Sequence, residues 1–66
     1  MIVQVNGEKK DLIPESTLLQ LVAELNLTPE RVAVELNGKV VPRAGWPTTQ
    51  LTDGDRIEIV HFVGGG

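Results

Sequence analysis

The sequence predicts a two-layer α+β domain in which one main helix covers one face of a mixed β-sheet. Three observations lead to this fold class. Two Asn-Gly pairs, at 6–7 and 37–38, each separate two strand-like runs, as in tight β-hairpins. Residues 17–25 carry apolar side chains at helical spacing, and residues 56–62 alternate as a final strand. One apolar helix stripe needs one sheet face to cover it.

The first hairpin is predicted from the start of the chain. Met1–Val5 alternates weakly, with Val3 and Val5 on one face. Asn6-Gly7 forms the turn, because both residues tolerate a positive φ. Glu8–Ile13 is expected to be the return strand, and Pro14 ends it.

The helix is predicted to begin at Ser16-Thr17. Thr17 and Gln20 have the spacing of a capping box, in which each side chain accepts a hydrogen bond from the other residue's backbone. Asn26 is the expected end. The apolar stripe has the spacing i, i+3, i+4, i+7, with Leu19 widening it: Leu18, Leu21, Val22 and Leu25.

The second half predicts three more strands. Thr28-Pro29-Glu30 suits a short helical turn. A second hairpin is predicted next, with a strand at 32–36, a turn at 37–38 and a return strand at 39–41. A loop or irregular segment at 43–49 and a turn at 53–55 then lead to a final strand at 56–62. If the last strand joins the first, the two run parallel across the helix crossover. That arrangement is the β-grasp.

Composition excludes several classes of protein. The 66 residues suffice for one small domain. A net charge of −3 argues against a nucleic-acid binder, which needs a basic face. The absence of cysteine excludes disulfides, cysteine nucleophiles and cysteine metal sites. With neither a long apolar run nor a signal pattern, no membrane partner is expected, and the cytoplasm is the default location.

The sequence closes with Gly64, Gly65 and Gly66, directly after the last predicted strand. We predict a domain at 1–63 and a flexible glycine tail at 64–66. Such a tail carries a carboxylate with no neighbouring side chains, so it can enter a narrow enzyme cleft. The carboxylate of Gly66 is therefore the leading candidate for the reacting group. A frayed terminus or a cloning remnant would look the same in this segment alone.

Together these segments resemble the ubiquitin-like sulfur carriers, and most of all the ThiS family of thiamine biosynthesis. The resemblance covers nearly the whole chain and rests on five segments: 2–7, 17–25, 34–43, 51–59 and 61–66. It implies a ubiquitin-like β-grasp that is a protein substrate and carrier rather than an enzyme, with no catalytic or metal-binding residues and no bound cofactor. Some relatives end in two glycines, whereas this chain has a third, Gly64.

The resemblance also implies the chemistry and the partners. A ubiquitin-activating-like adenylyltransferase would use ATP to adenylate the carboxylate of Gly66. Sulfur from a cysteine desulfurase route would then displace AMP and leave a thiocarboxylate, which thiazole synthase would consume. Two alternatives stay open: a sulfur carrier of another pathway, such as molybdopterin synthesis or tRNA thiolation, and a β-grasp interaction domain without a carrier role.

The last strand predicts where a partner docks. If Ile57 and Ile59 face the helix, Val60 and Phe62 face outward as exposed apolar groups that lead through Val63 into the tail. Ala33 and Ile2 are candidates to lie beside them.

Other tempting residues have simpler interpretations. The single histidine, His61, is interpreted as a structural or contact residue because a triad would need partners. Asp53 and Asp55 are interpreted as turn residues that bond local backbone. Lys9 and Lys10 are interpreted as solvated strand residues. Trp46 is expected to pack over the edge of the core.

Overall fold

The computed structural model describes residues 1–62, and Val63, Gly64, Gly65 and Gly66 lie outside the described residues. The predictions made for these four residues are therefore not addressed by the fold. The elements, in chain order, are β1 (Ile2–Val5), β2 (Glu8–Asp11), α1 (Leu18–Glu24), η1 (Pro29–Arg31), β3 (Val32–Leu36), β4 (Lys39–Val40), η2 (Arg43–Thr48) and β5 (Arg56–His61).

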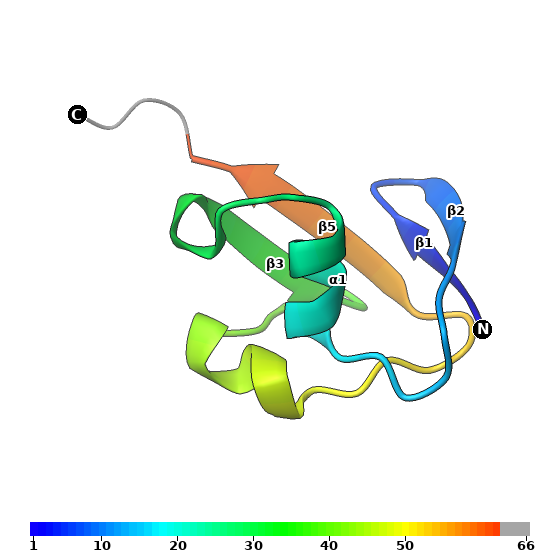
Figure 1. The fold of residues 1–66 in the computed structure, drawn as a ribbon. Coiled ribbons are helices and arrows are strands. Elements are labelled where there is room, and N and C mark those ends of the chain that lie inside the picture. The colour runs from blue at the N-terminus through cyan, green and yellow to red at the C-terminus, as the bar shows by residue number, and fades with distance from the viewer. Residues whose placement is uncertain (63–66) are drawn as a thin grey trace.

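The sheet has the mixed topology that the sequence predicts. Its order is β2-β1-β5-β3-β4. The β1–β2, β3–β4 and β3–β5 pairs are antiparallel, whereas β1 and β5 are parallel. Figure 1 looks onto the side of the sheet that α1 covers, with β5 running through the middle. This is the β-grasp arrangement, in which the last strand lies between the two hairpins.

The helix begins as the capping box predicts. The Gln20 amide donates to the Thr17 hydroxyl oxygen at 3.2 Å, and the Thr17 amide donates to the Gln20 side-chain oxygen at 2.8 Å. Asn26 follows the helix in the left-handed region, at φ 58°. Leu18, Leu21 and Val22 are buried. The expectation that Leu19 widens the apolar face is wrong, because its side chain is exposed beside the stripe.

The core lies between α1 and the sheet, and Trp46 belongs to it. We expected Trp46 at the core edge within an irregular loop. Instead, residues 43–48 form the 3₁₀ helix η2, and the Trp46 side chain is only 1% exposed. Its indole N–H donates to the Val41 carbonyl at 2.8 Å, so the one polar atom of the ring is satisfied.

Both Asn-Gly turns form as predicted. Asn6, Gly7, Asn37 and Gly38 all have φ between 50° and 87°, the left-handed region that a two-residue hairpin needs. The strand bounds differ slightly. The return strand of the first hairpin ends at Asp11 rather than Ile13, the second ends at Val40, and β5 ends at His61.

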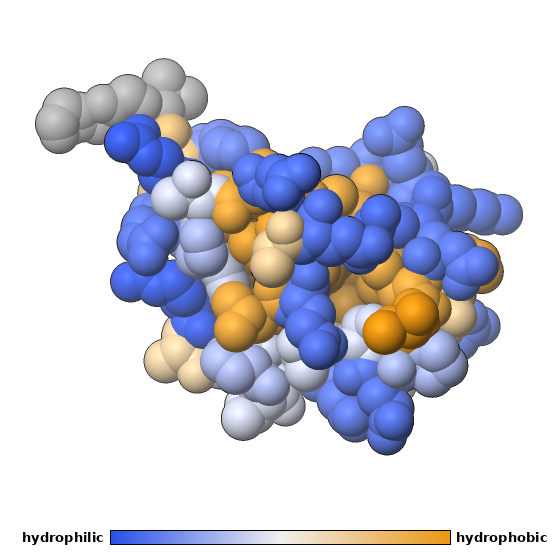
Figure 2. Space-filling view, viewed as in Figure 1, coloured by the Kyte–Doolittle hydropathy of each residue, from blue (hydrophilic) through white to orange (hydrophobic). Residues whose placement is uncertain are grey.

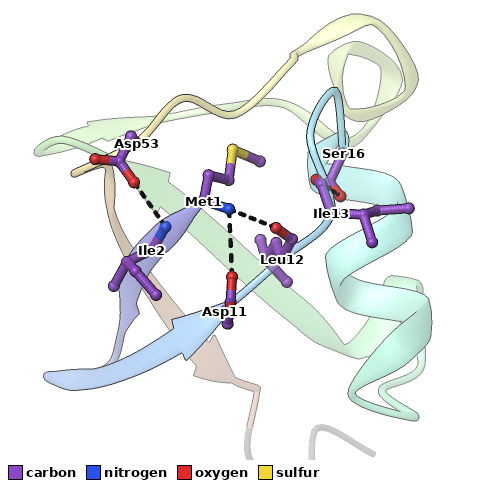
Figure 3. Close-up of polar contacts among 7 residues, drawn as sticks. All are labelled: Met1, Ile2, Asp11, Leu12, Ile13, Ser16 and Asp53. Carbon is purple, nitrogen blue, oxygen red and sulfur yellow. Dashed lines mark hydrogen bonds and ion pairs between the residues drawn. The ribbon is translucent and has the colours of Figure 1, made fainter.

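Contacts from the first two residues join β1 to two other segments. The Met1 amine donates to the Leu12 carbonyl at 2.8 Å and to Asp11 Oδ1 at 3.2 Å, and the Ile2 amide donates to Asp53 Oδ1 at 2.7 Å (Figure 3). These bonds hold the start of β1 between β2 and the turn that leads into β5. The N-terminus therefore lies near the beginning of β5, and β5 ends on the opposite side of the domain (Figure 1).

Candidate functional site at the end of β5

The two faces of β5 differ as the alternation predicts. Ile57 and Ile59 are buried under α1, at 1% and 8% exposure. Val60 and Phe62 are 57% and 59% exposed. No bulge interrupts the described β3–β5 pairing, which runs residue by residue from Leu36–Ile57 to Val32–His61. The prediction that Val60 and Phe62 face outward is therefore confirmed, and we call these two residues the apolar pair.

The neighbours of the apolar pair are partly as expected. Ala33 of β3 is the direct cross-strand partner of Val60. Just past β5, the Phe62 amide donates to the Arg31 carbonyl at 2.8 Å, which fixes the backbone at the last described residue. Ile2, however, does not lie beside the pair. Its carbonyl accepts from the Gly54 amide, so the parallel register puts Ile2 before the start of β5, at the far end from Phe62.

Sequence reasoning missed a side-chain clamp on β5. Asn6 Oδ1 accepts from the Ile59 amide at 2.7 Å, and Asn6 Nδ2 donates to the Ile59 carbonyl at 3.2 Å. The side-chain amide of Asn6 thus forms the two hydrogen bonds with the backbone of Ile59 that the backbone of a neighbouring strand would form. It does so just after β1 ends. The Asn-Gly signal revealed only the turn, since nothing local in the sequence marks a contact 53 residues away.

A groove opens beside this clamp. Its volume is about 440 Å³. Its lining includes apolar side chains from β1, β5 and the segment after α1, together with charged residues of β2: Val5, Leu25, Leu27, Ile59, Lys9 and Lys10. His61 also lines it. Lys10 lies 3.9 Å from Glu24 of α1. In the helix-side view of Figure 2, hydrophobic side chains reach the surface in separate patches among hydrophilic ones.

The start of β5 is fixed by two residues of turns. Asn37 Oδ1 accepts from the Arg56 amide at 2.9 Å, and Asn37 Nδ2 donates to Asp55 Oδ1 at 3.0 Å. Asp55 Oδ2 accepts from the Thr52 amide at 2.8 Å. Asp55 therefore bonds local backbone as predicted, whereas Asp53 reaches across to Ile2. Residues 1–62 contain no cluster of three acidic or histidine side chains that could hold a metal ion.

The pKa of the Asp55 carboxyl is lowered. Partial burial would raise it, but the hydrogen bonds from the Asn37 side chain and from Thr52 together outweigh that effect. Since the folded-state pKa lies below the unfolded one, Asp55 stabilises the fold above the unfolded value near 4, and this contribution is lost as the pH falls through the lowered pKa.

Acid unfolding of Asp55→Asn tests this contribution. We expect the variant to be less stable than the wild type at pH 7. The Asp55 carboxylate accepts hydrogen bonds from both Asn37 and Thr52, whereas an Asn side chain has only one acceptor oxygen and no charge. The difference should shrink from about pH 5 downward as Asp55 becomes protonated. Urea unfolding followed by circular dichroism across that pH range measures it. A stability difference that is constant with pH would contradict the assignment.

The residues predicted to carry the chemistry follow directly after this end of β5. Val63, Gly64, Gly65 and Gly66 lie outside the described residues, so the structure places only their point of departure at Phe62. That point has the apolar pair on one face of the sheet and the His61 groove on the other. Within residues 1–62, no helix has the length and apolar character needed to cross a bilayer.

Comparison with known proteins identifies relatives that align with nearly the whole chain. The chain is 39% identical to the sulfur carrier protein ThiS of Bacillus subtilis, over 98% of this chain and 100% of that protein. It is 38% identical to the thiazole synthase of Paramagnetospirillum magneticum and 42% identical to that of Magnetococcus marinus, over the whole chain. It spans only 20% of the length of these two synthases.

The solved structures give the same result for the fold. The crystal structure of a thiamine biosynthesis protein (ThiS) from Geobacter metallireducens superposes with a TM-score of 0.86, at 35% identity and with both chains fully covered. The profile of the ThiS family matches residues 3–66, which includes the three glycines. The predicted resemblance is confirmed: this chain belongs to the ThiS family.

Proposed function

We propose that the chain is a sulfur carrier for the synthesis of the thiazole ring of thiamine, with the carboxylate of Gly66 as the carrying group. The observation that supports this most strongly is the full-length likeness to a protein named sulfur carrier protein ThiS, with the family match extending through the last glycine. The architecture suits the role, since β5, which leads the chain to the glycines, pairs with β1 at its start and with β3 up to His61.

The chemistry follows from the weakness of a carboxylate as an electrophile. Attack of the Gly66 carboxylate on the α-phosphorus of ATP would release pyrophosphate and leave an acyl adenylate. Hydrosulfide would then displace AMP and leave a thiocarboxylate directly. A persulfide from the cysteine desulfurase route would displace AMP to give an acyl disulfide, which a thiol would reduce to the thiocarboxylate. ATP would be bound by the activating partner, so this chain would act as substrate and carrier rather than as enzyme, with no bound cofactor of its own.

Two enzymes are the proposed partners, an adenylyltransferase related to ubiquitin-activating enzymes and a thiazole synthase, with a cysteine desulfurase route as the sulfur donor. The thiazole synthase is supported by two proteins of that name that each contain a region similar to this whole chain. We place the reaction in the cytoplasm, where ATP is available.

The proposed docking surface is the apolar pair together with Val63, at the root of the glycine segment. Exposed apolar side chains on the open face of a sheet are typical of partner surfaces. Ordering a glycine segment in a cleft costs about 1–2 kcal/mol per residue, so contacts from the folded body must supply much of the affinity.

Phe62→Ala should weaken binding to the adenylyltransferase by about tenfold while leaving the fold unchanged, because the ring is 59% exposed in the free chain. The matched control is Ile13→Ala, which removes an even more exposed apolar side chain, at 74%, from the loop before α1. Titration calorimetry measures both. Equal affinities for Phe62→Ala and the wild type would remove Phe62 from the docking surface.

The function itself is tested by mass spectrometry of the intact chain after incubation with the adenylyltransferase, ATP and a sulfur donor. Replacement of one oxygen by sulfur, mapped to Gly66, is the expected result. Rescue of a thiamine auxotroph, but not of a strain lacking molybdenum cofactor, would identify the pathway. A chain that stays unmodified and supports neither pathway would overturn the proposal.

A further inference from the structure

Two glutamates face each other on the sheet surface that α1 does not cover. Glu35 of β3 and Glu58 of β5 are direct cross-strand partners. Ile57 and Ile59 point toward α1, so Glu58 between them points to the opposite face, and its partner Glu35 shares that face. Directly opposite residues have Cβ atoms about 4.5–5.5 Å apart, and like charges in that position are destabilising.

In the described part of the chain, no cation lies within ion-pair distance of either carboxylate of this acidic pair. The ion pairs found within residues 1–62 are those of the Met1 amine with Asp11 and of Lys10 with Glu24. Arg56 lies on the same face two residues before Glu58, but its cross-strand partner on β1 is Gln4. Free in solution, the chain therefore keeps a repulsive carboxylate pair that a single substitution would remove.

The acidic pair has apolar neighbours on two sides. Val40 of β4 is the direct partner of Glu35 and is 66% exposed. On the other side, the next row of the same face consists of Ala33 and Val60, with Val60 57% exposed. A partner that covers the apolar side chains would also take the two carboxylates out of water, which is costly unless a cation meets them.

We propose that the acidic pair Glu35/Glu58 receives an arginine side chain of the adenylating enzyme, next to Val60 of the docking surface. This inference rests on the proposed function. A guanidinium presents five N–H donors in a planar fork and can donate to two carboxylates at once, which a compact ammonium does less well. Binding would also relieve the repulsion between the two glutamates. The repulsion that destabilises the free chain would therefore add to the favourable free energy of binding.

Charge argues against a second copy of this chain as the occupant. A two-fold dimer through this face would bring the Glu35/Glu58 pair of each copy together, and four carboxylates would then be buried in one interface. A partner protein with a basic residue among apolar side chains is the complementary surface.

The test compares Glu35→Gln, Glu58→Gln and the double variant with Glu8→Gln. Glu8 gives the matched control, because it is an exposed β2 residue whose cross-strand partner is Val5 on the helix side. The probe is the adenylating enzyme of the same organism, with affinity measured by calorimetry at several NaCl concentrations and turnover by ATP–pyrophosphate exchange. Thermal unfolding of each free variant is measured in parallel.

Each single glutamine variant is expected to bind about tenfold more weakly, with KM raised and kcat kept, because the carboxyl of Gly66 is untouched. The free variants should unfold a few degrees higher, as the repulsion is removed. The double variant should lose the salt dependence of binding. Glu8→Gln should change neither quantity. This combination of a more stable chain and weaker binding separates recognition from misfolding.

Unchanged affinity of the double variant, with the wild type still adenylated, would overturn this inference and leave the proposed function standing. A wild-type chain that forms a dimer broken by Glu58→Gln would overturn it in favour of self-association. Failure of the wild type to be adenylated at all would overturn the proposed function, and this inference with it.

Discussion

A chain that lacks Gly66 is expected to fold like the full chain and to be inert toward ATP in the presence of the adenylating enzyme. Deletion moves the carboxylate back by one residue, about 3.8 Å between Cα atoms. Misplacement of a reacting group by even 1 Å can cost about 100-fold in rate. We therefore expect ATP–pyrophosphate exchange to fall at least 100-fold, while circular dichroism and the unfolding midpoint match those of the full chain.

Gly66→Ala is the informative companion variant. It keeps the length and the position of the carboxylate and adds only a methyl group, so it tests whether the enzyme cleft rejects side chains. Intermediate activity is expected, below the full chain and above the deletion. Exchange by the shortened chain at the rate of the full chain would show that the carboxylate need not stand at residue 66, since Gly65 would then be adenylated in its place.

Much of the fold could be predicted because its signals are local. A two-residue hairpin turn needs positive φ at both of its residues, and Asn-Gly is one of the few pairs that adopt it easily. The two Asn-Gly pairs therefore predicted both hairpins. The Thr17–Gln20 capping box spans three residues and fixed the start of α1. The alternation of residues along β5 correctly predicts that Ile57 and Ile59 are buried and that the apolar pair is exposed.

The unpredicted features depend on contacts between distant segments. Asn6 looks like a turn residue in the sequence, yet its side chain also pairs with the backbone of Ile59. The Glu35/Glu58 pair appears only once the β3–β5 register is known, because a shift of one residue would separate the two carboxylates. Likewise, Ile2 seemed a neighbour of Val60 until the parallel register put it at the other end of β5.

Trp46 shows how a segment without periodicity can still hold the core. Residues 43–49 contain Gly45 and Pro47 and have no helix or strand pattern, which predicts a loop or a short irregular segment. Its 3₁₀ turn instead carries the Trp46 indole into the core, where the side chain is 1% exposed. The Trp46 side chain alone fills the part of the core that several smaller side chains of a helix or strand would otherwise fill.

Trp46→Ala is accordingly expected to remove a large share of the free energy of unfolding. Truncating a buried Trp costs about 3–5 kcal/mol. A domain of this size has a total free energy of unfolding of about 3–10 kcal/mol. Trp46→Phe should cost less, about 1–3 kcal/mol, because it keeps an aromatic ring but removes the donor to the Val41 carbonyl. Urea unfolding followed by circular dichroism measures both variants.

The control is Ile13→Ala, which removes an apolar side chain that is 74% exposed and should change stability by less than about 0.5 kcal/mol. If Trp46→Ala were as stable as this control, the indole could not be a core residue. A different result, in which Trp46→Ala and Trp46→Phe lose equal stability, would assign the effect to the Val41 hydrogen bond alone. We instead expect the free energy of unfolding of Trp46→Ala to lie well below that of Trp46→Phe, which in turn lies below the wild type. Because both substitutions remove the hydrogen bond and only Trp46→Ala leaves a large cavity, this order assigns most of the lost stability to the buried volume of the ring.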